Sequence, residues 1–244
     1  MSLDPQIPAP PALEAAQPKL LAPLWHTALL IIVLLLVSIG GAGGRHALAG
    51  HSKLPQYIWG MTWEWIMAGY VWLGIRKRFT LRDIIGGRWD SFLNFLVDVA
   101  TAAGFWIVAA LVLAVGARLL LHGNADKIDE MRRQLGFLIP DTRLELAFWF
   151  LLSTTAGFCE EFIFRGYLQL QFAALTRSMF FGALLSAVVF GASHGYEGGA
   201  RMVLIGIFGL MFGILAWWRR SLRPGMIAHA WHDALSGVVL RMLK

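Results

Sequence analysis

Long apolar runs fill most of the chain after about residue 20. A helix that spans a membrane needs roughly 20 consecutive apolar residues, and runs of that kind recur between short polar connections. We place them at about 20–42, 55–75, 92–121, 146–172, 179–196, 202–218 and 224–241. Because lipid offers backbone groups no hydrogen-bond partners, each run must be helical. The pattern predicts an all-α fold, a polytopic transmembrane helical bundle of about seven or eight spans.

Composition indicates the same class of protein. Of the 244 residues, 57% are hydrophobic and 15% are charged, against about 25% charged in a soluble domain. Residues 1–18 hold five of the nine prolines together with several alanines, which favours a disordered tail. Residues 19–244 are expected to form a single transmembrane domain. The single cysteine, Cys159, excludes an intramolecular disulfide and a cysteine-based zinc site.

Basic residues gather beside the apolar runs. One cluster at 76–78 follows the second run and another at 219–223 lies four runs later, so both fall on one side of the membrane. The positive-inside rule makes that side cytoplasmic, which places the N-terminus in the cytoplasm. We expect an integral protein of a bacterial inner (plasma) membrane. The net charge of +6 is then explained by basic residues that orient the spans, and no nucleic-acid partner is expected.

Two polar connections carry local signals. Between the second and third runs, Thr80 and Asp83 have the spacing of a capping box. Ile84 and Trp89 follow at helical spacing, which predicts a short helix at the membrane interface. The segment 122–143 is the one sizeable polar connection, and it is expected to form an extramembrane loop that is partly helical.

Charges inside the fourth run are the first candidates for chemistry. Each costs about 2.5–3.5 kcal/mol within a span, so each needs a partner or a function. Glu161 and Arg165 are four residues apart and can pair on one helical face, which favours a structural role. Glu160 points about 100° away and has no partner in its own helix. We therefore single out Glu160 as the candidate functional carboxylate.

Histidines in two later runs complete the set. His194 lies near the end of the fifth run, where a lone histidine is most often a surface or capping residue. In the last run, His229 and Asp233 are four residues apart and share a face, whereas His232 is displaced from Asp233 and stays unassigned. The two side chains of such a pair can simply hydrogen-bond to each other. Because three runs each carry ionisable groups, however, a shared site is favoured.

Hydrolysis of a peptide bond by water fits these residues. A carboxylate in apolar surroundings can act as a general base, and a neighbouring imidazole can hold the water that it activates. A second histidine with an acid partner can stabilise the oxyanion that forms when water attacks an amide carbonyl. A covalent route would need Cys159, which has no evident cationic neighbour, or Ser193, which is adjacent to His194 and lacks a triad.

Three ordered motifs resemble those of a known family. They are Glu160-Glu161-x-x-x-Arg165, Phe190-x-x-x-His194 and His229-x-x-x-Asp233. They look like the motifs of the CPBP family, the type II CAAX prenyl endopeptidases and Abi-like membrane proteins, whose third motif ends in Asn or Asp. The resemblance covers roughly residues 140–240.

The resemblance implies a helical intramembrane peptidase fold and a role for each motif residue. Glu160 would be the base and His194 would hold the water. His229 with Asp233 would lie on the oxyanion side, and Glu161 with Arg165 would form a supporting pair. The implied activity is cleavage of a membrane-associated protein or peptide, which in some members is a lipidated CAAX protein, with membrane lipid as the surroundings and no cofactor.

Two other functions remain open from the sequence. In a zinc metallopeptidase, Glu160, His194 and His229 would bind Zn²⁺ and Glu161 would be the base. In a noncatalytic immunity or transport protein, the buried charges would line a pathway. The paired repeats and broken helices of many transporters are not evident in the sequence.

Overall fold

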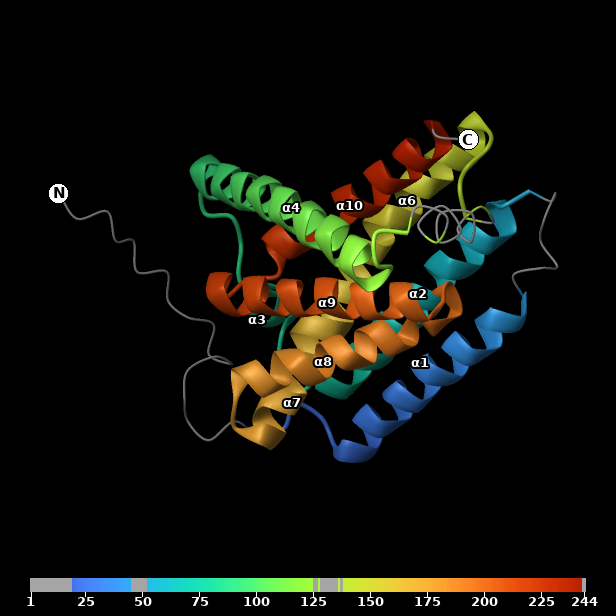
Figure 1. Ribbon diagram of the computed structural model, residues 1–244. Coiled ribbons are helices and arrows are strands. Elements are labelled where there is room, and N and C mark those ends of the chain that lie inside the picture. The colour runs from blue at the N-terminus through green and yellow to red at the C-terminus, as the bar shows by residue number, and fades with distance from the viewer. Residues whose placement is uncertain (1–18, 45–51, 125–126, 128–135, 137, 243–244) are drawn as a thin grey trace.

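The computed structural model describes residues 19–44, 52–124, 127, 136 and 138–242 (Figure 1). Within this part of the chain there are helices and turns but no strand. The tail expected at 1–18 and much of the loop expected at 122–143 lie outside the described residues. The described fold is therefore all-α, as the apolar runs predict.

The helices of the described residues coincide with the apolar runs. They are α1 (Leu24–Gly44), α2 (Leu54–Ile75), α4 (Phe92–Leu120), the continuous stretch of α6 (Arg143–Glu160), the π-helix η2 (Glu161–Leu168) and α7 (Gln169–Thr176), and then α8 (Met179–Ser193), α9 (Gly199–Arg219) and α10 (Arg223–Met242). Two short pieces, α3 (Leu81–Ile85) and η3 (Gly195–Glu197), lie between them.

Four of these helical stretches are long and apolar enough to cross a membrane. They are Leu24–Gly41, Phe92–Leu120, Arg143–Thr176 and Gly199–Arg219, and the apolar α8 is shorter. Large apolar side chains face outward along them: Phe92 and Leu119, near the two ends of α4, are each 73% exposed. Such a surface is stable in lipid rather than in water. The protein is an integral membrane protein, and seven or eight spans stay a prediction.

Small residues let the helices of the C-terminal part approach closely. In Figure 1, α8 runs beside α9 and α6 runs beside α10. A Cβ at Gly157 of α6 would lie 2.8 Å from the backbone nitrogen of Ala230 in α10, and one at Gly191 of α8 would lie 2.7 Å from the carbonyl of Met202 in α9. Helix pairs in membranes use such positions to bring backbones together. This packing sets the distances among the ionisable side chains of the three helices α6, α8 and α10.

The short helix predicted after the second run is present as α3, but it ends at Ile85, before Trp89, and its place at a membrane interface stays a prediction. Thr80 and Asp83 form the capping box, in which the Thr80 side chain accepts from the Asp83 amide and the Asp83 side chain accepts from the Thr80 amide. At its other end the carbonyl of Ile85 accepts hydrogen bonds from the Leu222 amide (2.9 Å) and the Ser221 hydroxyl (3.1 Å). The two basic clusters, at 76–78 and 219–223, therefore lie at the same end of the bundle.

Candidate active site

A change of helix type marks the site. The α-helix α6 ends at Glu160, and the π-helix η2 begins at Glu161. At its end the amide of Gln169 donates to the carbonyl of Phe164, five residues earlier. Wide turns of this kind occur frequently at functional sites. The sequence predicted a regular α-helix through this segment, so the widened turn is a correction.

The π-helix holds the ion pair that the four-residue spacing predicts. Arg165 Nη1 donates to Glu161 Oε1 at 2.9 Å, and the two residues are 2% and 0% exposed. Arg165 Nη2 also donates to the carbonyl of Gly209 in α9 at 3.1 Å, and the guanidinium lies 4.4 Å from the ring centroid of Phe190 in α8. The pair therefore ties η2 to two neighbouring helices.

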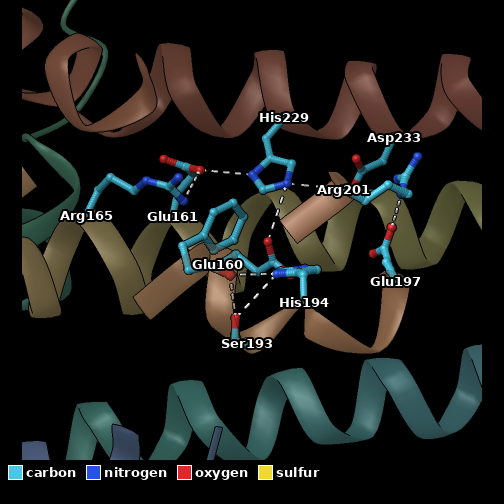
Figure 2. Close-up of polar contacts among 10 residues, drawn as sticks. Glu160, Glu161, Arg165, Ser193, His194, Glu197, Arg201, His229 and Asp233 are labelled. Carbon is cyan, nitrogen blue, oxygen red and sulfur yellow. Dashed lines mark hydrogen bonds and ion pairs between the residues drawn. The ribbon is translucent and has the colours of Figure 1, made fainter. Parts of the chain in front are cut away.

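Glu160 lies between two histidines that come from different helices (Figure 2). His194 Nε2 is 3.7 Å from one carboxylate oxygen, and His229 Nε2 is 3.4 Å from the other. The side chain of Glu160 is 10% exposed. Both distances exceed those of a normal hydrogen bond, and catalytic contacts are often this loose before a substrate binds. The structure thus brings Glu160, His194 and His229 together.

The end of α8 reaches the junction of α6 and η2, which the sequence could not show. His194 directly follows α8, which has only 15 residues. α8 packs against η2, where the Ser186 hydroxyl donates to the carbonyl of Phe164 at 2.7 Å. Because α8 is short and lies against the π-helix, its last residues meet the α6–η2 junction. His194 therefore lies beside Glu160.

The orientation of His194 follows from its backbone contact. Its Nδ1 lies 2.9 Å from the carbonyl of Phe190, and a carbonyl only accepts, so Nδ1 carries a proton. In the neutral ring, Nε2 is then an acceptor, and this is the atom that faces Glu160. Ser193 donates its hydroxyl proton to the same carbonyl at 2.8 Å. Its hydroxyl is thus engaged with the backbone.

His229 is held by Glu161 more closely than by the aspartate of its own helix. Its Nδ1 lies 2.9 Å from Glu161 Oε1, whereas its Nε2 is 3.6 Å from Asp233 Oδ2. The ring also stacks on Phe212 with centroids 5.1 Å apart. The spacing of four residues indicated Asp233 as the partner, so the sequence missed the contact between helices. His232, which the sequence left unassigned, packs against the ring of Phe208.

A second glutamate joins the site from α2. The carboxyl group of Glu64 lies close enough to that of Glu160 for a side-chain hydrogen bond. Helices α2 and α6 run side by side in the same direction. The ring of Tyr57 contacts that of Trp149, and two turns further along both helices the ring of Trp65 stacks on that of Phe158. Two carboxyl groups can share a hydrogen bond only when one keeps its proton. The sequence analysis did not single out Glu64, although a lone charge between two tryptophans in an apolar run is a visible signal.

The segment between α8 and α9 closes another edge of the site. Burial, and then the carboxylates of Glu197 and Glu160, raise the pKa of the Tyr196 hydroxyl well above its usual range. Tyr196 therefore stays neutral at ordinary pH. Glu197 is paired with Arg201 at 2.6 Å, and Figure 2 shows this pair beside His194 and Asp233. This connection places further polar groups on the side of the site where His194 lies.

The sequence offers Glu160, His194 and His229 as zinc ligands, and all three would have to gather around one ion. Within the described part of the chain, no group of three or more His, Cys, Asp or Glu side chains is arranged to hold a metal ion. The imidazole nitrogens of His194 and His229 instead face the oxygens of Glu160 at contact distance.

Comparison with known proteins agrees with the motifs. Residues 142–235 match the family described as type II CAAX prenyl endopeptidase Rce1-like. This segment holds Glu160, His194, His229 and Asp233, and it is consistent with the CPBP family that the three motifs indicate. No curated protein and no solved structure matches the chain in the other two comparisons.

Proposed function

We propose that the protein is an intramembrane endopeptidase in which Glu160 activates a water molecule. The observation that carries this proposal is the meeting of a buried carboxylate with two imidazoles, 3.4 and 3.7 Å away, from separate helices. The match of residues 142–235 to a peptidase family supports the same reaction class. In this scheme the site is a general-base centre enclosed by helices.

Each side chain has a part in the hydrolysis of an amide bond. Glu160 accepts a proton from water while the water oxygen attacks the substrate carbonyl. His194 Nε2, an acceptor in the neutral ring, holds the same water. His229 is oriented by Glu161 at Nδ1, and a second proton on its Nε2 would donate to the developing oxyanion.

Glu64 supplies the proton that the leaving group needs. When the C–N bond breaks, the amine must gain a proton, and the protonated member of the Glu64–Glu160 pair can provide it. The proton that Glu160 took from water then replaces the one that Glu64 gave up, and the two carboxyl groups share it again. The pair therefore begins and ends the cycle with one shared proton, and no other acid is required.

The substrate class follows from the surroundings of the site. Glu160 lies within an apolar stretch long enough to cross a membrane, so a substrate with its own hydrophobic anchor reaches it most readily. Each CH₂ of such an anchor contributes about 0.8 kcal/mol to membrane binding. We infer a membrane-anchored protein or peptide, with a lipidated, CAAX-like end as one member of this class. A bacterial inner membrane with a cytoplasmic N-terminus is the proposed location.

A peptide assay in reconstituted membranes tests the proposal. A fluorogenic peptide with a lipid or apolar anchor is given to wild type and to Glu160→Gln, with and without a strong chelator. We expect turnover without added metal and a loss of about 10²- to 10⁴-fold in the variant, with the same unfolding temperature as wild type. Ser193→Ala is the matched control and should keep most of the turnover, because that hydroxyl is bound to the backbone.

Three outcomes would redirect the proposal. Activity that disappears with chelator and returns with Zn²⁺ would favour the metallopeptidase. Folded protein that cleaves no member of a broad anchored-peptide library would favour the noncatalytic immunity or transport function. Equal turnover of wild type and Glu160→Gln would remove Glu160 from the chemistry.

A further inference from the structure

A cavity of about 480 Å³ lies between the α3–α4 connection, α6 and α10. None of the residues of the Glu160 site lines it. Its lining combines two guanidinium side chains and an indole with apolar residues, namely Arg88, Arg223 and Trp89 with Phe158, Met226 and Ile227 among others. A cavity of this size and mixed character is typical of a site for a small amphipathic ligand.

Positive charge is in surplus beside this cavity. Asp98, which is 1% exposed, accepts a hydrogen bond from Trp89 Nε1 at 2.8 Å. The same carboxylate contacts Arg219 at 3.2 Å and Arg223 at 2.9 Å, so one negative charge faces two positive ones. Among the described residues, the buried Nη1 of Arg223 has no hydrogen-bond partner. With Arg88 also in the lining, the cavity is suited to an anion.

The residue types around the cavity are those of a membrane–water interface. The short helix α3 contributes Ile85 to the lining, and Trp89, which is 45% exposed, is of the residue type that marks such interfaces. The basic clusters at 76–78 and 219–223 lie at the same end of the bundle. Basic pockets between membrane helices bind the head groups of acidic lipids. A free phosphate ion would use the arginines but would leave the apolar lining empty.

We propose that this cavity binds one anionic phospholipid. Its phosphate lies against Arg88 and Arg223, and an acyl chain follows Phe158, Met226 and Ile227 toward the lipid. Phe158 is two residues before Glu160, and Ile227 is two residues before His229. A bound lipid therefore braces the two helices that carry the Glu160 site. This binding stands apart from the proposed reaction and is measured without any substrate.

Native mass spectrometry of the full chain in detergent tests the site. The probes are a phosphatidylglycerol, a phosphatidylcholine with the same acyl chains, and glycerol phosphate without chains. We expect one phosphatidylglycerol per protein to be retained and neither of the other two. Arg88→Gln should weaken this binding by about fivefold, since one arginine near a membrane surface contributes about 1 kcal/mol.

A matched variant separates a built site from general surface charge. Arg82→Gln removes the same charge from the adjacent exposed segment, but Arg82 does not line the cavity, so binding should be nearly unchanged. Ile227→Trp should fill the cavity and displace the lipid without changing any charge. Equal weakening by Arg82→Gln and Arg88→Gln would overturn the proposal in favour of a diffuse surface potential. Equal retention of phosphatidylcholine or of glycerol phosphate would overturn the anionic-lipid assignment.

Discussion

Asp98 and Glu160 are both buried carboxylates, but their surroundings differ. Asp98 accepts hydrogen bonds from the Trp89 indole at 2.8 Å and the Arg219 guanidinium at 3.2 Å, and the Arg223 guanidinium lies in ion-pair contact at 2.9 Å. Glu160 is met by two imidazoles at 3.4 and 3.7 Å and by a second carboxyl group. The first carboxylate is surrounded by tightly bound cations, whereas the second is not.

This difference distinguishes a carboxylate with a structural role, Asp98, from one that can act as a general base, Glu160. The oxygens of Asp98 are occupied by close donors, so they cannot readily accept a proton from water. Glu160 keeps acceptor capacity because its neighbours stand farther away. Burial alone does not distinguish the two, since both residues are less than 10% exposed. The number of close donors does.

The largest effect is expected from Arg165→Ala. Removing the guanidinium leaves the fully buried Glu161 without its closest cation and frees the carbonyl of Gly209. Breaking a buried pair costs about 3–5 kcal/mol, and His229 loses its positioning because Glu161 holds it. We expect a large fall in unfolding temperature in detergent together with loss of turnover. A variant with wild-type stability and no turnover would instead place Arg165 in the chemistry.

A smaller effect, on activity alone, is expected from Glu64→Gln. The amide can hydrogen-bond to Glu160 but cannot pass on a proton, so kcat should fall about 100-fold while KM changes little. The unfolding temperature should stay near that of wild type, because the ring contacts between α2 and α6 remain. Thr62→Val, an exposed position on α2, is the control. Full turnover by Glu64→Gln would show that Glu64 only positions Glu160.

Asp98→Asn is expected to lower stability and to leave activity unchanged, the reverse of Glu64→Gln. Arg219 and Arg223 lose their shared counter-charge, but their side chains are 24% and 15% exposed and can draw on water. The stability loss should therefore be below that of a fully buried pair, about 2 kcal/mol. The kcat of the remaining folded protein should be unchanged, as measured in the anchored-peptide assay at a temperature below unfolding. A fall in kcat without loss of stability would break the contrast between the two carboxylates.

Hydrophobic patterning predicted the helices well because lipid imposes a simple rule. The apolar runs match helices within a few residues, and the capping box of α3 is present. The rule fixes where a helix lies but not how long its membrane-embedded part is. The described helices include four that meet the length and apolarity of a span, so the count of spans goes beyond what patterning alone establishes.

The site was harder to predict because its contacts join different helices. Spacing along one helix found the Glu161–Arg165 pair but indicated Asp233 for His229, whose closest carboxylate is Glu161. The π-helix depends on packing around η2, which no spacing rule reports. Glu64 is distant in sequence from every motif, and only the parallel packing of α2 against α6 brings it to Glu160.

The smallest effect is expected from Asp233→Asn. The carboxylate of Asp233 is 3.6 Å from His229 Nε2, beyond hydrogen-bonding distance, and its side chain is 31% exposed. Partly exposed ion pairs contribute about 0.2–1 kcal/mol, so kcat/KM should fall by no more than about fivefold. An asparagine is also accepted at this position in the family that the motifs resemble. Glu161→Gln is the matched comparison, and it should cost far more because Glu161 binds both His229 and Arg165 directly. If Asp233→Asn instead lowered kcat/KM as strongly as Glu161→Gln, the aspartate rather than the glutamate pair would be the group that orients His229 during turnover.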